Sequence, residues 1–145
     1  MRAGVLTMGA LLGRYNSCSV SKPGGCSLGP RDYGWHLKGF NKLGAENKLR
    51  GGYINLSAKK GLIGNTYKFP KVTVTGSSNL IMAAVLTKGI TTLKNISIEP
   101  EVIDLITFLK NGGAKIKQVG KRTIKIFGVK KLLGCSHKII GDRIE

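Results

Sequence analysis

The sequence is poor in acidic residues. Seven aspartates and glutamates stand against 24 lysines and arginines, and the formal net charge is +17. Between Met1 and Ile98 the only acids are Asp32 and Glu46. Such an excess of positive charge indicates an anionic partner, and it leaves nucleic acid, an anionic membrane surface and a phosphorylated substrate open.

Long hydrophobic runs are also missing. The longest apolar run, residues 80–86, is far shorter than the roughly 20 residues of a membrane-spanning helix. The apolar N-terminus is interrupted by glycines and Arg14, and no small-residue cleavage site follows it, so it predicts an amphipathic helix rather than a signal peptide. We therefore expect a soluble protein, with no membrane partner.

The three cysteines have no CxxC spacing and are odd in number, which argues against a disulfide framework and a zinc site. His36 and His137 do not cluster with cysteines or acids at ligand spacing, so the sequence predicts neither a metal nor a cofactor. The cysteine content fits a reducing compartment, and we expect a cytoplasmic protein.

What is present is a core-forming pattern: 41% of the 145 residues are hydrophobic, enough for one domain or most of one. The second predicted helix turns Trp35, Leu37, Phe40 and Leu43 inward and ends at Gly44. In chain order, the first half predicts a helix over 4–15, a strand over 17–21, a glycine- and proline-rich loop over 22–30, a helix over 32–43 and strands over 46–49 and 53–58.

The second half repeats this order. It predicts a helix over 79–87, a strand over 91–97, a helix from Glu99-Pro100 to Leu109 and strands over 114–119 and 123–129. Gly44-Ala45 corresponds to Gly113-Ala114, and a strand over 67–75 would complete a second βαβαββ unit. The first unit lacks that opening strand, so we expect a piece of a longer protein, divided as 1–66, 67–134 and a link over 135–145.

Six segments resemble, in order, the UDP-N-acetylglucosamine enolpyruvyl transferases along nearly the whole chain. They are "RAGVLTMGALLGRY" (2–15), "PGGCSLGPR" (23–31), "HLKGFNKLGAE" (36–46), "KVTVTGSSNLIMAAVLTKG" (71–89), "EPEVIDLITFLKNGGAKI" (99–116) and "DRIE" (142–145). The resemblance implies an α/β (α+β) fold of βαβαββ repeats, with helices inside and sheets outside. This chain would hold about two of the three units of one domain.

The activity that the resemblance implies is transfer of the enolpyruvyl group of phosphoenolpyruvate to the 3-hydroxyl of UDP-N-acetylglucosamine. Phosphate is released, and the step commits the sugar to peptidoglycan synthesis. Cys26 matches the family's proton donor, the target of the epoxide antibiotic fosfomycin. Its glycine-rich loop lets backbone approach a ligand closely, and neighbouring Lys22 and Arg31 favour the thiolate. Without the resemblance, a small buried residue is the commoner fate of a lone cysteine.

The resemblance also assigns substrate-binding residues. Arg31 matches an arginine that faces both substrates, and a guanidinium suits phosphate because it can bind it in two places. Arg2 matches another arginine near the nucleotide sugar. The family's "PVDLH" is replaced by Asp32, Tyr33, Gly34, Trp35 and His36, so the family aspartate falls on Gly34. Trp35 is a core candidate as much as a uridine contact.

A second substrate-binding stretch is Lys71, Val72, Thr73 and Val74, which matches the family segment that meets the diphosphate and uridine. Lys71 would be the phosphate cation and Thr73 a hydroxyl donor. An ordinary strand with one exposed lysine is the competing interpretation.

Two other functions compete with the enzyme. A basic nucleic-acid-binding module fits the charge, but the lysines are spread over the chain, aromatics make up only 6% and no binding motif is present. An inactive truncated remnant is the other alternative. The family also needs an N-terminal lysine and asparagine, and an aspartate and arginine from a second domain. We therefore expect negligible turnover unless that domain or a complementing chain supplies them.

Overall fold

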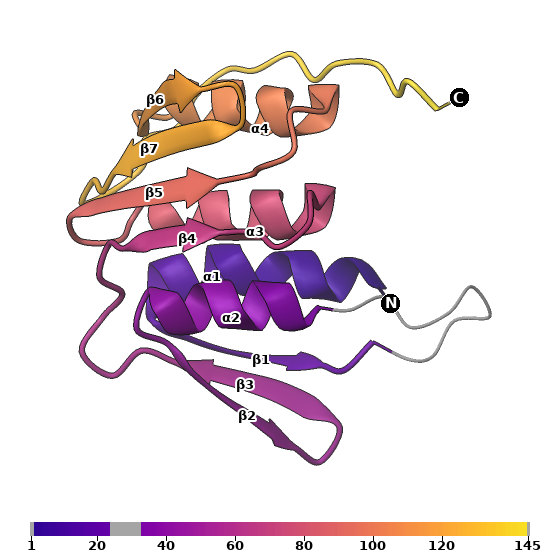
Figure 1. Ribbon diagram of the computed structural model, residues 1–145, viewed down its shortest axis with the longest axis vertical. Coiled ribbons are helices and arrows are strands. Elements are labelled where there is room, and N and C mark those ends of the chain that lie inside the picture. The colour runs from indigo at the N-terminus through magenta and orange to yellow at the C-terminus, as the bar shows by residue number, and fades with distance from the viewer. Residues whose placement is uncertain (1, 24–32, 145) are drawn as a thin grey trace.

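The computed structural model describes residues 2–23 and 33–144. Two α/β units follow one another along the chain, and each places helices against one face of its own sheet (Figure 1). No helix in these two ranges is both long and apolar enough to cross a membrane.

The first unit contains a three-stranded antiparallel sheet of order β1-β3-β2. Its amphipathic first helix is preceded by a turn of 3-10 helix. The elements are the 3-10 helix η1 (Arg2–Leu6), α1 (Thr7–Tyr15), β1 (Ser17–Ser21), α2 (Gly34–Lys42), β2 (Glu46–Arg50) and β3 (Tyr53–Ser57).

The second unit has the same order and one strand more. Its sheet runs β4-β5-β7-β6, with β4 parallel to β5 and the other pairs antiparallel. The strands β5, β7 and β6 therefore repeat the pairing of β1, β3 and β2. The elements are β4 (Thr66–Lys68), α3 (Val74–Ala84), β5 (Ile90–Lys94), α4 (Pro100–Asn111), β6 (Lys115–Gly120) and β7 (Thr123–Phe127).

The second helix of each unit ends in the same way. Gly44 and Gly113 both have φ of +99°, a left-handed conformation that glycine adopts without steric cost. The next amide then turns back onto the helix: Ala45 N donates to Phe40 O at 3.0 Å, and Ala114 N donates to Leu109 O at 2.9 Å. The repeat predicted from the sequence is confirmed at this level of detail.

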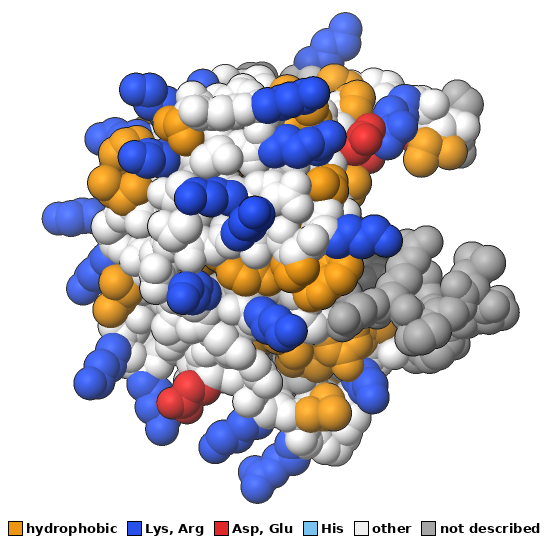
Figure 2. Space-filling view, viewed as in Figure 1, with side chains coloured by type: hydrophobic (Ala, Val, Ile, Leu, Met, Phe, Trp, Pro, Cys, Tyr) orange, Lys and Arg blue, Asp and Glu red, His pale blue; other side chains and the backbone are white. Residues whose placement is uncertain are grey.

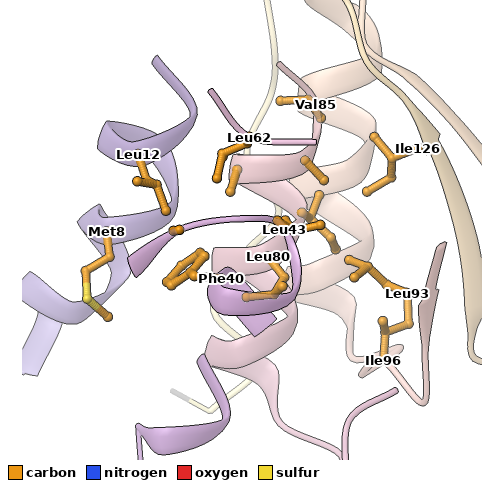
Figure 3. Packing of buried hydrophobic residues seen from close by; sticks show 14 of the residues in the cluster. Met8, Leu12, Phe40, Leu43, Leu62, Leu80, Val85, Leu93, Ile96 and Ile126 are labelled. Atoms are coloured by element: carbon orange, nitrogen blue, oxygen red, sulfur yellow. The ribbon is translucent and has the colours of Figure 1, made fainter. Parts of the chain in front are cut away.

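The core joins the two units. Met8 and Leu12 of α1, Phe40 of α2 and Leu80 of α3 are fully buried and point toward one another (Figure 3). The helices α1 and α3 approach closely because α1 carries small residues on that face. A Cβ on Gly9 would overlap the Asn79 carbonyl.

Three expectations need correction. The strand over 67–75 ends at Lys68, because Pro70 has no N–H to donate and Thr73 then caps a helix. That helix begins at Val74, not at residue 79, and ends at Ala84. On α2, Phe40 and Leu43 are buried as expected, but Trp35 and Leu37 are only half-buried.

The C-terminal segment follows α4 back without forming a helix or strand. Leu133 N donates to Gly112 O at 2.8 Å. His137 Nε2 lies 3.0 Å from Asp104 Oδ1. Arg143 bridges Glu99 and Glu101 with N–O distances of 3.1 Å each. The C-terminal segment therefore pairs with Glu99, the N-cap of α4, and with the two acids inside the helix, Glu101 and Asp104.

Candidate functional site

The four α-helices of the described residues begin at the same edge of the molecule, the edge toward which β1, β4 and β5 also run (Figure 1). Their N-terminal ends carry partial positive charge and free backbone N–H groups. Three of the four helix starts carry residues that the resemblance assigns to substrate. This edge is the candidate site.

The predicted site residues fall into two groups. Cys26, Arg31 and Asp32 lie outside the described residues. Asp32 is also the residue at which the sequence predicts the start of α2. Arg2 begins η1, and only its backbone is described. The remaining site residues lie at two helix starts. The start of α2 carries Tyr33, Gly34 and Trp35. The start of α3 carries Lys71, Val72, Thr73 and Val74.

The start of α3 is built around Thr73. This residue is extended, with φ −139° and ψ 127°, and its Oγ1 accepts a hydrogen bond from Gly76 N at 3.2 Å. Because Oγ1 acts as an acceptor, its hydroxyl proton remains available to a ligand. Lys71 and Val72 lie just before this cap and are exposed. An exposed cation thus stands beside the N-terminal end of a helix, an arrangement that favours phosphate.

The start of α2 is anchored from the other unit. Tyr33 caps the helix, and His36 N donates to its carbonyl at 3.0 Å. Tyr67 donates its hydroxyl to Trp35 O at 2.9 Å, and burial raises the pKa of that hydroxyl. The backbone at residues 33–35 is therefore fixed, while the Trp35 side chain is only half-buried.

The sequence analysis missed two buried polar residues beneath these helix starts. His36 is 3% exposed and Asn79 is fully buried. The inward face of α2 comprises His36, Gly39 and Phe40, which is a regular helical spacing. Counting only apolar side chains put Trp35 on that face in place of His36, whereas Leu37 is half-buried and packs against the core.

Of the two described cysteines, Cys18 differs from what a reactive thiol requires. Cys18 is half-buried, its Sγ lies 3.9 Å from Met8 O, and burial raises its pKa. A raised pKa leaves less thiolate at neutral pH. Cys135 is exposed. Among the described residues, no group of three or more histidines, cysteines and acids could hold a metal ion.

An open apolar groove of about 740 Å³ runs between α1, α3 and α4. It is lined by Leu6, Thr7, Ala10, Leu11, Val74, Thr75, Ser78, Met82, Glu101 and Leu105. Elsewhere, lysine and arginine side chains project over the whole face seen in Figure 2 and do not gather at one place.

Known proteins match the chain along its full length. The model of the family described as EPSP synthase (3-phosphoshikimate 1-carboxyvinyltransferase) matches residues 1–145. The UDP-N-acetylglucosamine 1-carboxyvinyltransferase of Pelagibacter ubique is 49% identical over 145 residues, and that of Hydrogenovibrio crunogenus is 50% identical over 145 residues. The chain is covered completely in both matches, and it spans 35% and 34% of those relatives.

Solved structures with the same fold are more distant in sequence. The enolpyruvyl transferase NikO from Streptomyces tendae has a TM-score of 0.69 at 22% identity, covering 86% of this chain and 29% of its own. EPSP synthase from Acinetobacter baumannii has a TM-score of 0.69 at 21% identity, covering 91% and 30%. The chain belongs to the EPSP synthase (3-phosphoshikimate 1-carboxyvinyltransferase) family, and along its whole length it is homologous to UDP-N-acetylglucosamine 1-carboxyvinyltransferases.

Proposed function

We propose that this chain forms the cysteine-bearing half of a UDP-N-acetylglucosamine 1-carboxyvinyltransferase site. The reaction would move the enolpyruvyl group of phosphoenolpyruvate to the 3-hydroxyl of the sugar and release phosphate, in the cytoplasm, as the committed step of peptidoglycan synthesis. The observation that carries the proposal is the 48–50% identity to relatives of that name across all 145 residues. Identity at this level along the whole chain supports a function shared with these relatives.

The chemistry divides among three parts of the chain. Addition of the sugar hydroxyl to C2 of phosphoenolpyruvate needs an acid for the methylene carbon, and Cys26 takes that role. Arg31 and Arg2 would bind anionic groups of the substrates. Lys71 would bind the diphosphate, supported by its exposure beside the α3 start, and Thr73 would donate its hydroxyl.

Tyr33, Gly34 and Trp35 would meet the uridine chiefly through backbone, because Gly34 has no side chain where the family has a carboxylate. Support comes from the Tyr67 hydrogen bond that fixes Trp35 O. Asp32 is adjacent in sequence and is the nearest replacement carboxylate.

The rest of the site would come from a second domain or a complementing chain. In this proposal the chain divides into a first unit over 1–66, a second over 67–134 and a link over 135–145. The apolar groove between α1, α3 and α4 would face the remainder of the transferase, since an open apolar surface of this kind is a contact site in larger proteins. The chain alone would then show negligible turnover of phosphoenolpyruvate.

A titration with UDP-N-acetylglucosamine tests the substrate assignment without requiring turnover. We expect the amide signals of residues 71–76 and 33–36 to shift in NMR spectra, and Lys71→Met to weaken binding about tenfold through loss of a phosphate contact. Lys60→Met, at an exposed lysine in the turn after β3, is the matched control. Equal loss in both variants would indicate nonspecific charge attraction and reject the assignment. Such attraction is what the nucleic-acid alternative predicts.

A further inference from the structure

The three segments assigned to substrate share one buried feature. Arg2 opens η1, which contains Val5. Residues 33–35 run into His36, and residues 71–74 run into Thr75. Val5, His36 and Thr75 all belong to a single hydrogen-bonded network centred on Asn79.

Asn79 uses both ends of its amide. Its Oδ1 accepts from Gly9 N at 2.9 Å, and its Nδ2 donates to Val5 O at 2.8 Å. These two partners fix the orientation of the amide, because Gly9 N can only donate and Val5 O can only accept. Asn79 of α3 thus holds both α1 and the 3-10 helix before it.

The same amide nitrogen faces His36. Asn79 Nδ2 lies 2.9 Å from His36 Nδ1. Since an amide NH₂ only donates, His36 Nδ1 must accept, and the imidazole carries its proton on Nε2. That Nε2 lies 3.5 Å from Thr75 Oγ1. One buried pair therefore connects the start of α2 to α3 and, through Asn79, to α1.

We propose that Asn79 and His36 are positioning residues that hold the three helix starts in the arrangement that binds the nucleotide sugar. Both residues are buried, so in this proposal they act through the segments that they hold and not through contact with the ligand. This inference rests on the proposed function, because the segments positioned are those assigned to UDP-N-acetylglucosamine. Its physical basis is the cost of leaving a buried donor unpaired, which makes the network satisfied in one arrangement only.

Two variants separate the Nδ1 contact from the presence of a polar side chain. In His36→Asn the amide oxygen takes the place of Nδ1 and can still accept from Asn79. In His36→Gln the amide reaches the place of Nε2 and leaves Asn79 Nδ2 without that acceptor. Thr91→Val is the control for deleting a buried polar group, since Thr91 Oγ1 is buried on β5 with no partner among the described residues.

The measurements are the dissociation constant for UDP-N-acetylglucosamine and amide hydrogen exchange at Gly9 and Gly76 in the full 145-residue chain. We expect His36→Gln to weaken binding and speed exchange about tenfold, with His36→Asn and Thr91→Val within about threefold of the unmodified chain. Equal behaviour of the Gln and Asn variants, whether both normal or both impaired, would overturn the positioning role. If the unmodified chain binds no nucleotide sugar, the proposed function fails, and the exchange rates alone decide the positioning claim.

Discussion

The two units share a strand order and differ most in one connection. In the first unit, residues 22–33 join β1 to α2, whereas in the second unit residues 95–99 join β5 to α4. The strand order and the glycine that ends the second helix are the same in both units. The longer connection contains Cys26 and Arg31. The repeat supplies the scaffold, and the proposed proton donor and the arginine beside it belong to the connection that departs most from it.

The sheets differ as well. On β1 and β3 the exposed or half-buried positions are mostly serine and asparagine, whereas their counterparts β5 and β7 expose Lys94 and Lys125. Lys117 and Lys125 are direct cross-strand partners, a like-charge pair that weakens the sheet slightly. Surface composition has therefore diverged while the pairing has been kept.

The contact between the units is the most sensitive place to test this comparison. We expect Gly9→Ala to lower the free energy of unfolding by about 3 kcal/mol or more, because the added methyl overlaps the Asn79 backbone. Urea denaturation measures the change. Gly4→Ala, where nothing lies within 4 Å, is the control and should be close to neutral. A Gly9→Ala protein as stable as the control would mean that α1 and α3 are not in close contact.

The equivalence of the units can be tested at their helix ends. Gly44→Ala and Gly113→Ala each force a side chain into φ of +99°, and we expect losses of about 1–3 kcal/mol that agree within about 0.5 kcal/mol. The measurement is again the urea midpoint at constant slope. Two clearly different losses would show that the matching geometry does not carry matching energy.

The starts of the first helices distinguish the units. Thr73 caps α3 through its side chain, whereas Leu6 before α1 makes no such bond. Thr73→Ala should cost about 1 kcal/mol of stability and Thr73→Ser only a few tenths. Thermal unfolding of the two variants is the check. Similar losses in both would assign the effect to the lost methyl group and not to the cap.

The smallest effect concerns α4, whose acids pair with the C-terminal segment. The hydrogen bond from Arg143 lowers the pKa of Glu101. A lowered folded-state pKa contributes stability above the ordinary glutamate range, and this contribution is lost as the pH falls through the folded pKa. Arg143→Ala should return the Glu101 pKa toward its ordinary value in an NMR titration. An unchanged pKa would show that the pair is not formed in solution.

Most of the fold follows from the sequence, because it rests on local signals. Glycines mark helix ends at Gly44 and Gly113 and a turn at Gly51-Gly52. Apolar periodicity located the helices between these breaks. The predicted start of α3 was wrong because the residues of "KVTVT" alternate between polar and apolar, as in a strand. The preceding Pro70 and the cap made by Thr73 decide the structure there.

The site was only partly predictable. Cys26 and Lys71 were proposed because they sit in recognisable motifs, and their roles stay predictions. His36 and Asn79 were not, since a buried polar pair leaves no periodic apolar pattern and its members are 43 residues apart. Their role depends on tertiary packing, which brings α1, α2 and α3 together.

The most direct test is the intact mass of the chain after incubation with fosfomycin, with and without UDP-N-acetylglucosamine, followed by peptide mapping. We expect one adduct, on Cys26, formed faster with the nucleotide sugar. Cys18, whose pKa is raised by burial, and Cys135 serve as internal controls. Equal labelling of all three cysteines, or no adduct, would contradict the proposed site and favour an inactive remnant.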